Sequence, residues 1–244
     1  MTTVDRESIT TGQVARIDSA DDARATADRL AAEFAVGAAA RDRDRRLPHD
    51  EIEHLSRSGL LAITVPAAYG GPDLAPSVVA DMTRRLAAAD PNIAQIPHSH
   101  FVYLNLLRLN GNHDLASRQF GAVLAGGRIA NAQSERGGKT IADIATRLVA
   151  ADGRLALTGE KFYATGSLYA HTLAVLARLD EPFGDLVAGE YVAFVPADAP
   201  GVTIIDDWNG MGQRTTGSGT VRFADVVVDP IDLVERAPAV STPT

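Results

Sequence analysis

The sequence predicts an α+β protein in which an all-helical domain precedes an antiparallel β-sandwich or β-barrel domain. Two observations support this fold class. Up to about residue 127, apolar residues recur at steps of three and four, which is the spacing of one helix face. After Gly126-Gly127 they fall instead in short β-rich runs, separated by turn pairs such as Asp152-Gly153. Helices first and strands second is not the alternation of a doubly wound sheet.

The helical half is expected to start with one long amphipathic helix between Asp18 and Arg46. Its apolar stripe consists of Ala23, Ala27, Leu30, Phe34 and Ala38. A shorter helix is expected from Pro48, a residue suited to a first helical turn, to Gly59. Turn-forming residues make 60–71 a loop. Three more helices are expected over residues 78–89, 101–109 and 115–124.

The β-rich half contains short runs with the residue types of strands. These runs cover residues 128–132, 145–150, 154–157, 171–177, 191–196, 202–205 and 220–228. We therefore divide the chain into a flexible N-terminus (1–18), a helical domain (19–127), a β domain (128–232) and a tail (233–244). The polar, proline-containing composition of the tail predicts disorder.

Composition excludes several classes of function. The chain has 244 residues, no cysteine and a formal net charge of −8. The acidic balance leaves no excess of Lys and Arg for a nucleic-acid backbone, and the lack of cysteine excludes disulfides, a thiolate nucleophile and Cys-based metal sites. Residues 1–12 do not resemble a signal peptide, and no apolar run reaches bilayer length. We expect a cytoplasmic protein that binds neither nucleic acid nor membrane.

The histidines do not predict a metal site. His49 and His54 are five residues apart, about 140° around a helix, so they cannot share a face. His98 and His100 have no Asp or Glu nearby in sequence to complete a ligand set. The chain has no Gly-x-Ser-x-Gly elbow, and the Gly-Met-Gly at 210–212 lacks the spacing of a dinucleotide fingerprint. Serine hydrolysis and nicotinamide binding therefore lose support.

Polar residues cluster in three segments of the β-rich half, at 131–135, 165–167 and 208–218. Small hydroxyl residues and glycines let backbone N–H groups approach a phosphate or a flavin edge, and Trp208 could stack on an aromatic ring. Ordinary turn chemistry accounts for the same residues. The residues alone leave both interpretations open.

Three segments resemble the acyl-CoA dehydrogenases in sequence, order and separation. Residues 60–71, LLAITVPAAYGG, are similar to the Gly-Leu...Pro-x-x-Tyr-Gly-Gly segment of that family. NAQSERGGKT (131–140) resembles its flavin-binding Thr-Glu-Pro-x-x-Gly-Ser segment, and LTGEKFYATG (157–166) resembles its Asn-Gly-x-Lys-x-(Trp/Tyr)-Ile-Thr-Asn segment. The resemblance covers about residues 20–235 and implies the helical and β domains of the family.

Three further features are similar to the flavin-dependent monooxygenases of this superfamily, a branch with sulfur-acquisition oxidoreductases and dibenzothiophene monooxygenases. The features are AQIPHSHF at 94–101, DDW at 206–208 followed by GQRTTGSG at 212–219, and Asn131 at the start of the flavin loop.

The resemblance implies that seven residues contact a flavin: Asn131, Ser134, Thr140, Tyr163, Thr165, Trp208 and Ser218. Thr165 is expected at the reactive N5/C4a edge of the ring, and Ser218 near the phosphate. His98 or His100 is the candidate hydrogen-bond donor to the flavin after it has reacted with O2, so these two and Thr165 are the candidate catalytic residues. A core histidine satisfied by a helix carbonyl is the equal alternative for either one.

The function implied is a two-component monooxygenase, in which a separate flavin reductase supplies reduced FMN and O2 oxygenates a small organosulfur compound such as a sulfone. The alternatives are an FAD-dependent acyl-CoA dehydrogenase, and a non-catalytic remnant or half of a split enzyme. The third alternative arises because the family continues into a C-terminal helical bundle after the equivalent of Asp229-Pro230. We therefore expect either a homo-oligomer or a complementing helical domain as a partner.

Overall fold

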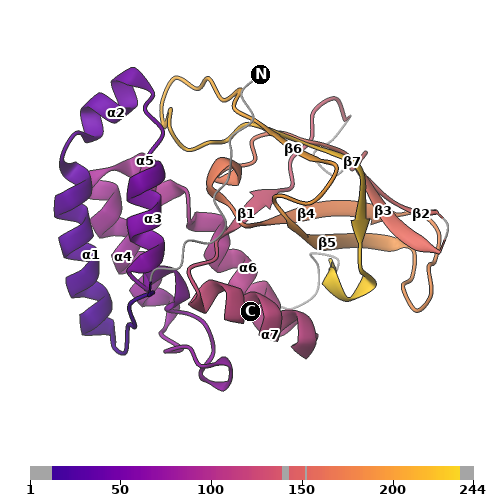
Figure 1. Ribbon diagram of the computed structural model, residues 1–244, viewed down its shortest axis with the longest axis horizontal. Helices are drawn as coiled ribbons and strands as arrows, with labels where there is room; N and C mark the ends of the chain where they lie inside the picture. The colour runs from indigo at the N-terminus through magenta and orange to yellow at the C-terminus, as the bar shows by residue number, and fades with distance from the viewer. Residues whose placement is uncertain (1–12, 139–142, 152, 237–244) are drawn as a thin grey trace.

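Figure 1 shows the computed structural model, which describes residues 13–138, 143–151 and 153–236. The helical half comes first, as predicted. Its α-helices are α1 (Ala20–Ala35), α2 (Ala38–Asp44), α3 (His49–Arg57), α4 (Pro76–Ala89), α5 (Pro91–Gln95), α6 (His98–Leu109) and α7 (His113–Leu124). The predicted loop at 60–71 contains two 3-10 turns, η1 (Leu60–Ala62) and η2 (Ala67–Tyr69).

The β half forms one sheet with the order β6-β7-β3-β2-β4-β5-β8, and β1 pairs with β4 off this path. The strands are β1 (Ile129–Ala132), β2 (Arg147–Ala151), β3 (Arg154–Lys161), β4 (Thr172–Leu179), β5 (Gly189–Pro196), β6 (Val202–Ile205), β7 (Thr220–Val228) and β8 (Leu233–Glu235). The turns η3 (Ser167–Tyr169) and η4 (Pro230–Asp232) complete it. The α+β fold class is confirmed.

The sheet is mixed, whereas the sequence predicted an antiparallel one. Both β1 and β2 pair with β4 in parallel, and the other pairs are antiparallel. Short turns force antiparallel pairing between β2 and β3. The longer segment from Lys161 to Thr172 imposes no such direction, so β4 can run parallel to β2.

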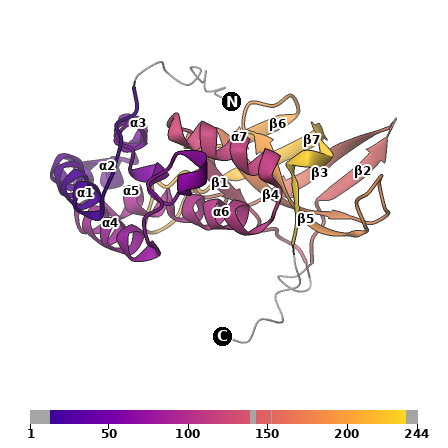
Figure 2. The same cartoon turned by 90° about the horizontal axis from the view of Figure 1, so that it is seen from below.

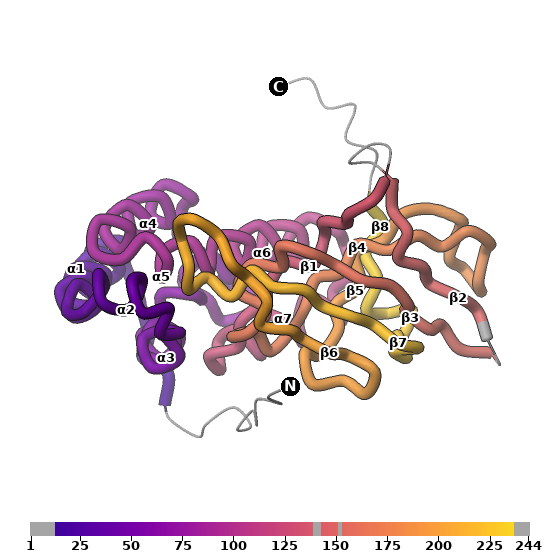
Figure 3. The backbone as a smooth tube through the Cα atoms, turned by 90° about the horizontal axis from the view of Figure 1, so that it is seen from above, coloured from indigo at the N-terminus to yellow at the C-terminus, as the bar shows by residue number. Residues whose placement is uncertain are grey.

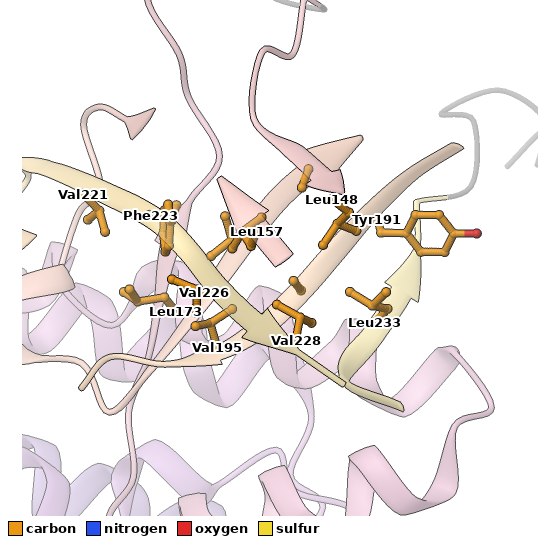
Figure 4. Packing of buried hydrophobic residues seen from close by; sticks show 14 of the residues in the cluster. Leu148, Leu157, Leu173, Tyr191, Val195, Val221, Phe223, Val226, Val228 and Leu233 are labelled. Carbon is orange, nitrogen blue, oxygen red and sulfur yellow. The ribbon is translucent and has the colours of Figure 1, made fainter. Parts of the chain in front are cut away.

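One hydrophobic core lies between two parts of the sheet, because β3 and β7 pack over β4 and β5 (Figure 4). Val221 and Phe223 of β7 face this core together with Leu173 of β4 and Val195 of β5. Leu157 of β3 is fully buried there. Alternate residues of β4 and β5 point into this core, and the residues between them, such as Ala174 and Phe194, are buried on the opposite face.

A second contact joins the halves, because α6 and α7 cover the face of the sheet formed by β1, β4 and β5 (Figure 2). Tyr103 of α6 packs edge-to-face on Phe194 of β5, with ring centroids 6.2 Å apart. Phe120 of α7 and Ile129 of β1 are buried in the same cluster. Figure 3 shows the segment after β6 reaching towards α2 and α5. None of the described helices is long and apolar enough to cross a membrane.

The predicted helix at 18–46 is interrupted, and this part of the prediction was wrong. Gly37 separates α1 from α2 at φ +75°, a left-handed conformation that ends a helix and that glycine adopts without strain. Arg41 is buried after the break, and its guanidinium pairs with Glu51 and Asp90 at 2.9 Å each. Helical spacing places Arg41 on the same stripe as Phe34 and Ala38, but the partners of its charge come from distant parts of the chain, so this ion network could not be predicted from periodicity.

Two terminal segments are more ordered than predicted. Ala15 donates its backbone N–H to Arg57 O at 2.8 Å, and Ile17 is buried, so residues 13–18 pack on α3 and do not form a flexible end. The predicted tail begins too early, because Leu233 and Val234 are buried in β8, paired with β5. Both segments carry apolar residues that the core covers.

Candidate functional site

The site starts from a contact between the segment after β3 and the segment before β7. Thr165 Oγ1 lies 2.9 Å from Ser218 Oγ, and Thr216 Oγ1 lies 2.7 Å from the same Ser218 oxygen. Backbone bonds hold the two segments together, from Ala164 N to Gly219 O and from Gly166 N to Thr216 O, both at 3.0 Å. Three hydroxyls from two distant segments of the protein therefore form one hydrogen-bonded chain.

Two expected flavin contacts meet directly in this structure. Thr165 was expected at the ring edge of a flavin and Ser218 at its phosphate, and their hydroxyl oxygens are in hydrogen-bond contact. The two side chains therefore form one continuous polar surface.

Trp208 and Tyr163 stand beside this hydroxyl chain. Their rings meet edge-to-face with centroids 6.3 Å apart. The Trp208 Nε1–H donates to Gln213 O at 2.8 Å, and this bond closes the short loop between Trp208 and Gln213. Gly210 lies flat against the indole, since a Cβ there would stand 2.4 Å from Trp208 Cζ2. The indole is therefore held in one orientation by its own loop.

Tyr163 is an exposed aromatic residue with an unusual backbone. Its φ is +57°, a left-handed conformation that is rare for a bulky residue, and 47% of its surface is exposed. The Arg136 guanidinium lies 4.4 Å from the centroid of the Phe162 ring and 4.7 Å from that of Tyr163. Strained residues of this kind gather at functional sites, which makes Tyr163 a candidate binding surface.

The β1 loop, defined as residues 131–138, is held against β3 by a buried ion pair. Lys161 Nζ donates to Glu135 Oε1 at 2.6 Å and to Gln133 O at 3.2 Å, and the Lys161 side chain has no exposed surface. Burial lowers the pKa of Lys161, and Glu135 opposes that shift. Burial would raise the pKa of Glu135, but hydrogen bonds from Lys161, Ala145 and Thr146 outweigh it and leave this pKa below its ordinary value.

The other expected contacts on the β1 loop are partly engaged within the protein. Asn131 Oδ1 accepts a hydrogen bond from Tyr103 OH at 2.9 Å. Ser134 has an exposed side chain, and its carbonyl accepts from Phe162 N at 2.9 Å, which joins this loop to Tyr163. Thr140 lies outside the described residues.

The two candidate histidines lie in different environments. His100 is 1% exposed, its Nε2 bonds Leu61 O at 2.9 Å, and its Nδ1 accepts from Ile129 N at 3.1 Å. Burial lowers the pKa of His100 to about 4. With both ring nitrogens bonded to the main chain, His100 is a core residue, which is the alternative that the sequence left open for either histidine. His98 is exposed at the first residue of α6.

Sequence reasoning assigned no role to Lys161, although a signal was present. Leu155, Leu157 and Lys161 share the inward phase of β3, where a charged residue needs a buried partner. The sequence also did not identify Tyr103 or Arg136 as site residues. Tyr103 bonds to Asn131, which is distant in the sequence, and the partners of Arg136 are aromatic rings. No group of three or more His, Cys, Asp or Glu within the described ranges could hold a metal ion.

Two family models match this chain. The N-terminal domain of acyl-CoA dehydrogenase matches residues 18–127, and the middle domain of acyl-CoA dehydrogenase matches residues 130–226. The chain belongs to the acyl-CoA dehydrogenase family. Within the family it resembles monooxygenases. The probable FMNH2-dependent monooxygenase SfnC of Pseudomonas putida is 29% identical over 223 residues, which are 91% of this chain and 54% of that protein.

Two further acyl-CoA dehydrogenase relatives support the same branch. Dibenzothiophene monooxygenase of Rhodococcus qingshengii is 29% identical over 222 residues, covering 89% of this chain and 52% of the relative. The crystal structure of FMN-bound TdsC from Paenibacillus sp. A11-2 matches with a TM-score of 0.79 at 28% identity, over 88% of this chain and 54% of that one. The chain thus spans about half the length of the relatives it matches.

Proposed function

We propose that this chain forms part of an FMNH2-dependent two-component monooxygenase. A separate flavin reductase supplies the reduced FMN, and the substrate is a small organosulfur compound such as a sulfone. The names of SfnC and dibenzothiophene monooxygenase and the FMN bound to TdsC support this proposal. The observation that carries it is the linked hydroxyl chain of Thr165, Ser218 and Thr216 beside the exposed ring of Tyr163.

The residues at the site fit a flavin ring. A flavin has two apolar faces and an edge of hydrogen-bonding atoms, and Tyr163 with Trp208 offers an aromatic surface next to the hydroxyl of Thr165. We place Thr165 and Ser218 together at the N5 edge of the ring. Asn131 and Ser134 of the β1 loop would approach from the neighbouring segment, because Ser134 is joined to Phe162.

Bound FMN would supply the activation of O2 and the transfer of one oxygen atom, which no side chain of the protein provides. The residues of the chain bind the ring, orient it and keep water from its reactive edge. His98 remains the candidate hydrogen-bond donor, since both ring nitrogens of His100 are engaged in the core.

Trp208, the only tryptophan of the chain, tests flavin binding directly. We expect FMN added to the purified chain to quench Trp208 fluorescence in a saturable way. Tyr163→Ala should weaken FMN binding by about tenfold through the lost aromatic contact, and Tyr163→Phe should preserve it. Equilibrium dialysis of the Trp208→Phe variant provides the control that does not depend on fluorescence.

Other results would favour the alternatives. Copurified FAD that is bleached by an acyl-CoA thioester would favour an acyl-CoA dehydrogenase. A folded chain that binds neither flavin would favour a non-catalytic remnant, and binding restored by a separately expressed helical domain would favour a split enzyme. Light scattering of the purified chain would show whether it forms a homo-oligomer.

A further inference from the structure

The hydroxyl chain of the site has a fixed proton direction. Each hydroxyl donates one hydrogen and accepts through its lone pairs, whereas a carbonyl only accepts. Thr216 Oγ1 donates to Gln213 O at 3.1 Å, so its hydrogen is used there. In the 2.7 Å contact between Thr216 and Ser218, Ser218 must therefore be the donor.

Thr165 is in turn the donor to Ser218. The Ser218 hydrogen points to Thr216, so in the 2.9 Å contact between Thr165 and Ser218 the donor is Thr165. The Thr165 hydroxyl, which is partly exposed, then has no hydrogen left for a bound ligand and presents only lone pairs. A ligand group that faces Thr165 must be a hydrogen-bond donor.

The carbonyl at the end of the chain is itself held in place. Gln213 has φ +49°, a left-handed conformation for a residue other than glycine, and its carbonyl also accepts the Trp208 Nε1–H at 2.8 Å. Thr216 and Ser218 are almost fully buried, which excludes water as a competing partner for their hydroxyls. The carbonyl of Gln213 therefore fixes both the orientation of the Trp208 indole and the direction of the hydrogen bonds along the hydroxyl chain.

We propose that this proton order makes Thr165 a selector for reduced flavin. The inference rests on the proposed function and on Thr165 at the N5 edge. In oxidised flavin N5 carries a lone pair and no hydrogen, so it would face the lone pairs of Thr165. In reduced flavin N5 carries a hydrogen, which Thr165 can accept. The site thereby discriminates between the product of a reductase and spent, oxidised flavin.

The test compares the dissociation constants of reduced and oxidised FMN, measured anaerobically through Trp208 fluorescence. The wild-type chain should bind reduced FMN more tightly, by about tenfold, because one hydrogen bond is gained and one lone-pair clash avoided. Thr216→Val removes the link to Gln213 O, lets Ser218 donate to Thr165 and frees the Thr165 hydrogen, so the preference should fall by about tenfold. Thr216→Ser keeps the hydroxyl and should keep the preference.

A ligand control separates proton order from general damage to the site. In 5-deaza-FMN the N5 atom is replaced by carbon, so Thr216→Val should not change its ratio of oxidised to reduced affinity. An unchanged FMN ratio in Thr216→Val, or an equal change with 5-deaza-FMN, would overturn the inference while leaving flavin binding intact. A wild-type chain that binds neither form of FMN would instead overturn the proposed function, and this inference with it.

Discussion

The two loops that line the candidate site are held in different ways. The β1 loop is fixed chiefly by the β half, where Glu135 is paired with the buried Lys161, and Tyr103 of α6 adds one hydrogen bond to Asn131. The loop at 206–218 is bonded to both halves: Gly166 N donates to Thr216 O within the β half, while Asn92 Oδ1 of α5 accepts from Thr215 N at 3.1 Å and Arg45 pairs with Asp206. The position of the 206–218 loop therefore depends more on how the helical half packs against the sheet.

In the contact between the 206–218 loop and the helical half, one carboxylate oxygen accepts two hydrogen bonds. Asn92 Nδ2 donates to Asp42 Oδ1 at 3.3 Å, and Arg214 N donates to the same oxygen at 3.3 Å. Two successive backbone N–H groups of the loop, those of Arg214 and Thr215, thus end on side chains of α2 and α5. These groups would be costly to leave unpaired, so α2 and α5 determine where the loop lies.

The largest effect is expected for the β1 loop. Lys161→Met leaves the Glu135 carboxylate buried without its partner, and we expect a loss of about 3 to 5 kcal/mol in the free energy of unfolding, measured by urea denaturation. Hydrogen exchange should increase in residues 131–138 and not in 206–218. The double variant Lys161→Met, Glu135→Gln should recover part of the stability. A double variant as unstable as the single one would contradict the role of the pair.

His100 predicts a pH dependence at the contact between β1 and the helical half. Its pKa of about 4 in the folded chain is below the value of about 6.5 in an unfolded one. The stability linked to neutral His100 is therefore complete above pH 6.5 and is lost as the pH falls towards 4, by roughly 3 kcal/mol. In His100→Asn the amide oxygen can accept from Ile129 N without titrating.

The measurement for His100 is the urea unfolding free energy at several pH values between 7 and 4. The wild type should show a steeper decline than His100→Asn across this window, even where the variant is less stable at pH 7. Parallel pH profiles would show that the ring is not the group that titrates.

A smaller effect is expected for the contact that holds the 206–218 loop. Asn92→Asp keeps an acceptor for Thr215 N but places a carboxylate against Asp42, which we expect to cost about 2 kcal/mol. Hydrogen exchange should rise at Arg214 and Thr215, while the β1 loop stays protected. Exchanging the two residues, Asp42→Asn with Asn92→Asp, restores one amide and one carboxylate. If the exchanged pair is no better than the single variant, this contact does not position the loop.

Sequence reasoning predicted most of the fold because periodicity reports which face of an element is buried. The order of helices before strands and the turn residues of the hairpins are local signals of this kind. The parallel pairing of β1 with β4 is not local, since it joins Ile129 to Thr172. The break at Gly37 was missed because Ala38 continues the apolar spacing across it, although the residue type permits a turn.

The site was predicted in part, for a similar reason. The resemblance to family motifs predicted that Thr165 and Ser218 belong to one site. Only the three-dimensional structure shows that their hydroxyls form a hydrogen bond with a defined donor. His98 and His100 are indistinguishable by residue type, and their roles separate because one faces solvent and the other bonds Leu61 and Ile129. Residue type determines which chemistry is available, and long-range packing determines where it acts.

The packing of α6 and α7 on the sheet has a consequence for synthesis on the ribosome. The face that α6 and α7 turn to the sheet is covered by residues such as Ala174, Val192 and Phe194, which are translated long after Leu124. Until those strands emerge, the nascent helices carry an uncovered apolar surface that is prone to aggregation. We expect a nascent chain stalled just after α7 has left the exit tunnel to be captured by chaperones, and one stalled after β5 has left it to escape them. Crosslinking of stalled ribosomes at the two lengths would measure this difference.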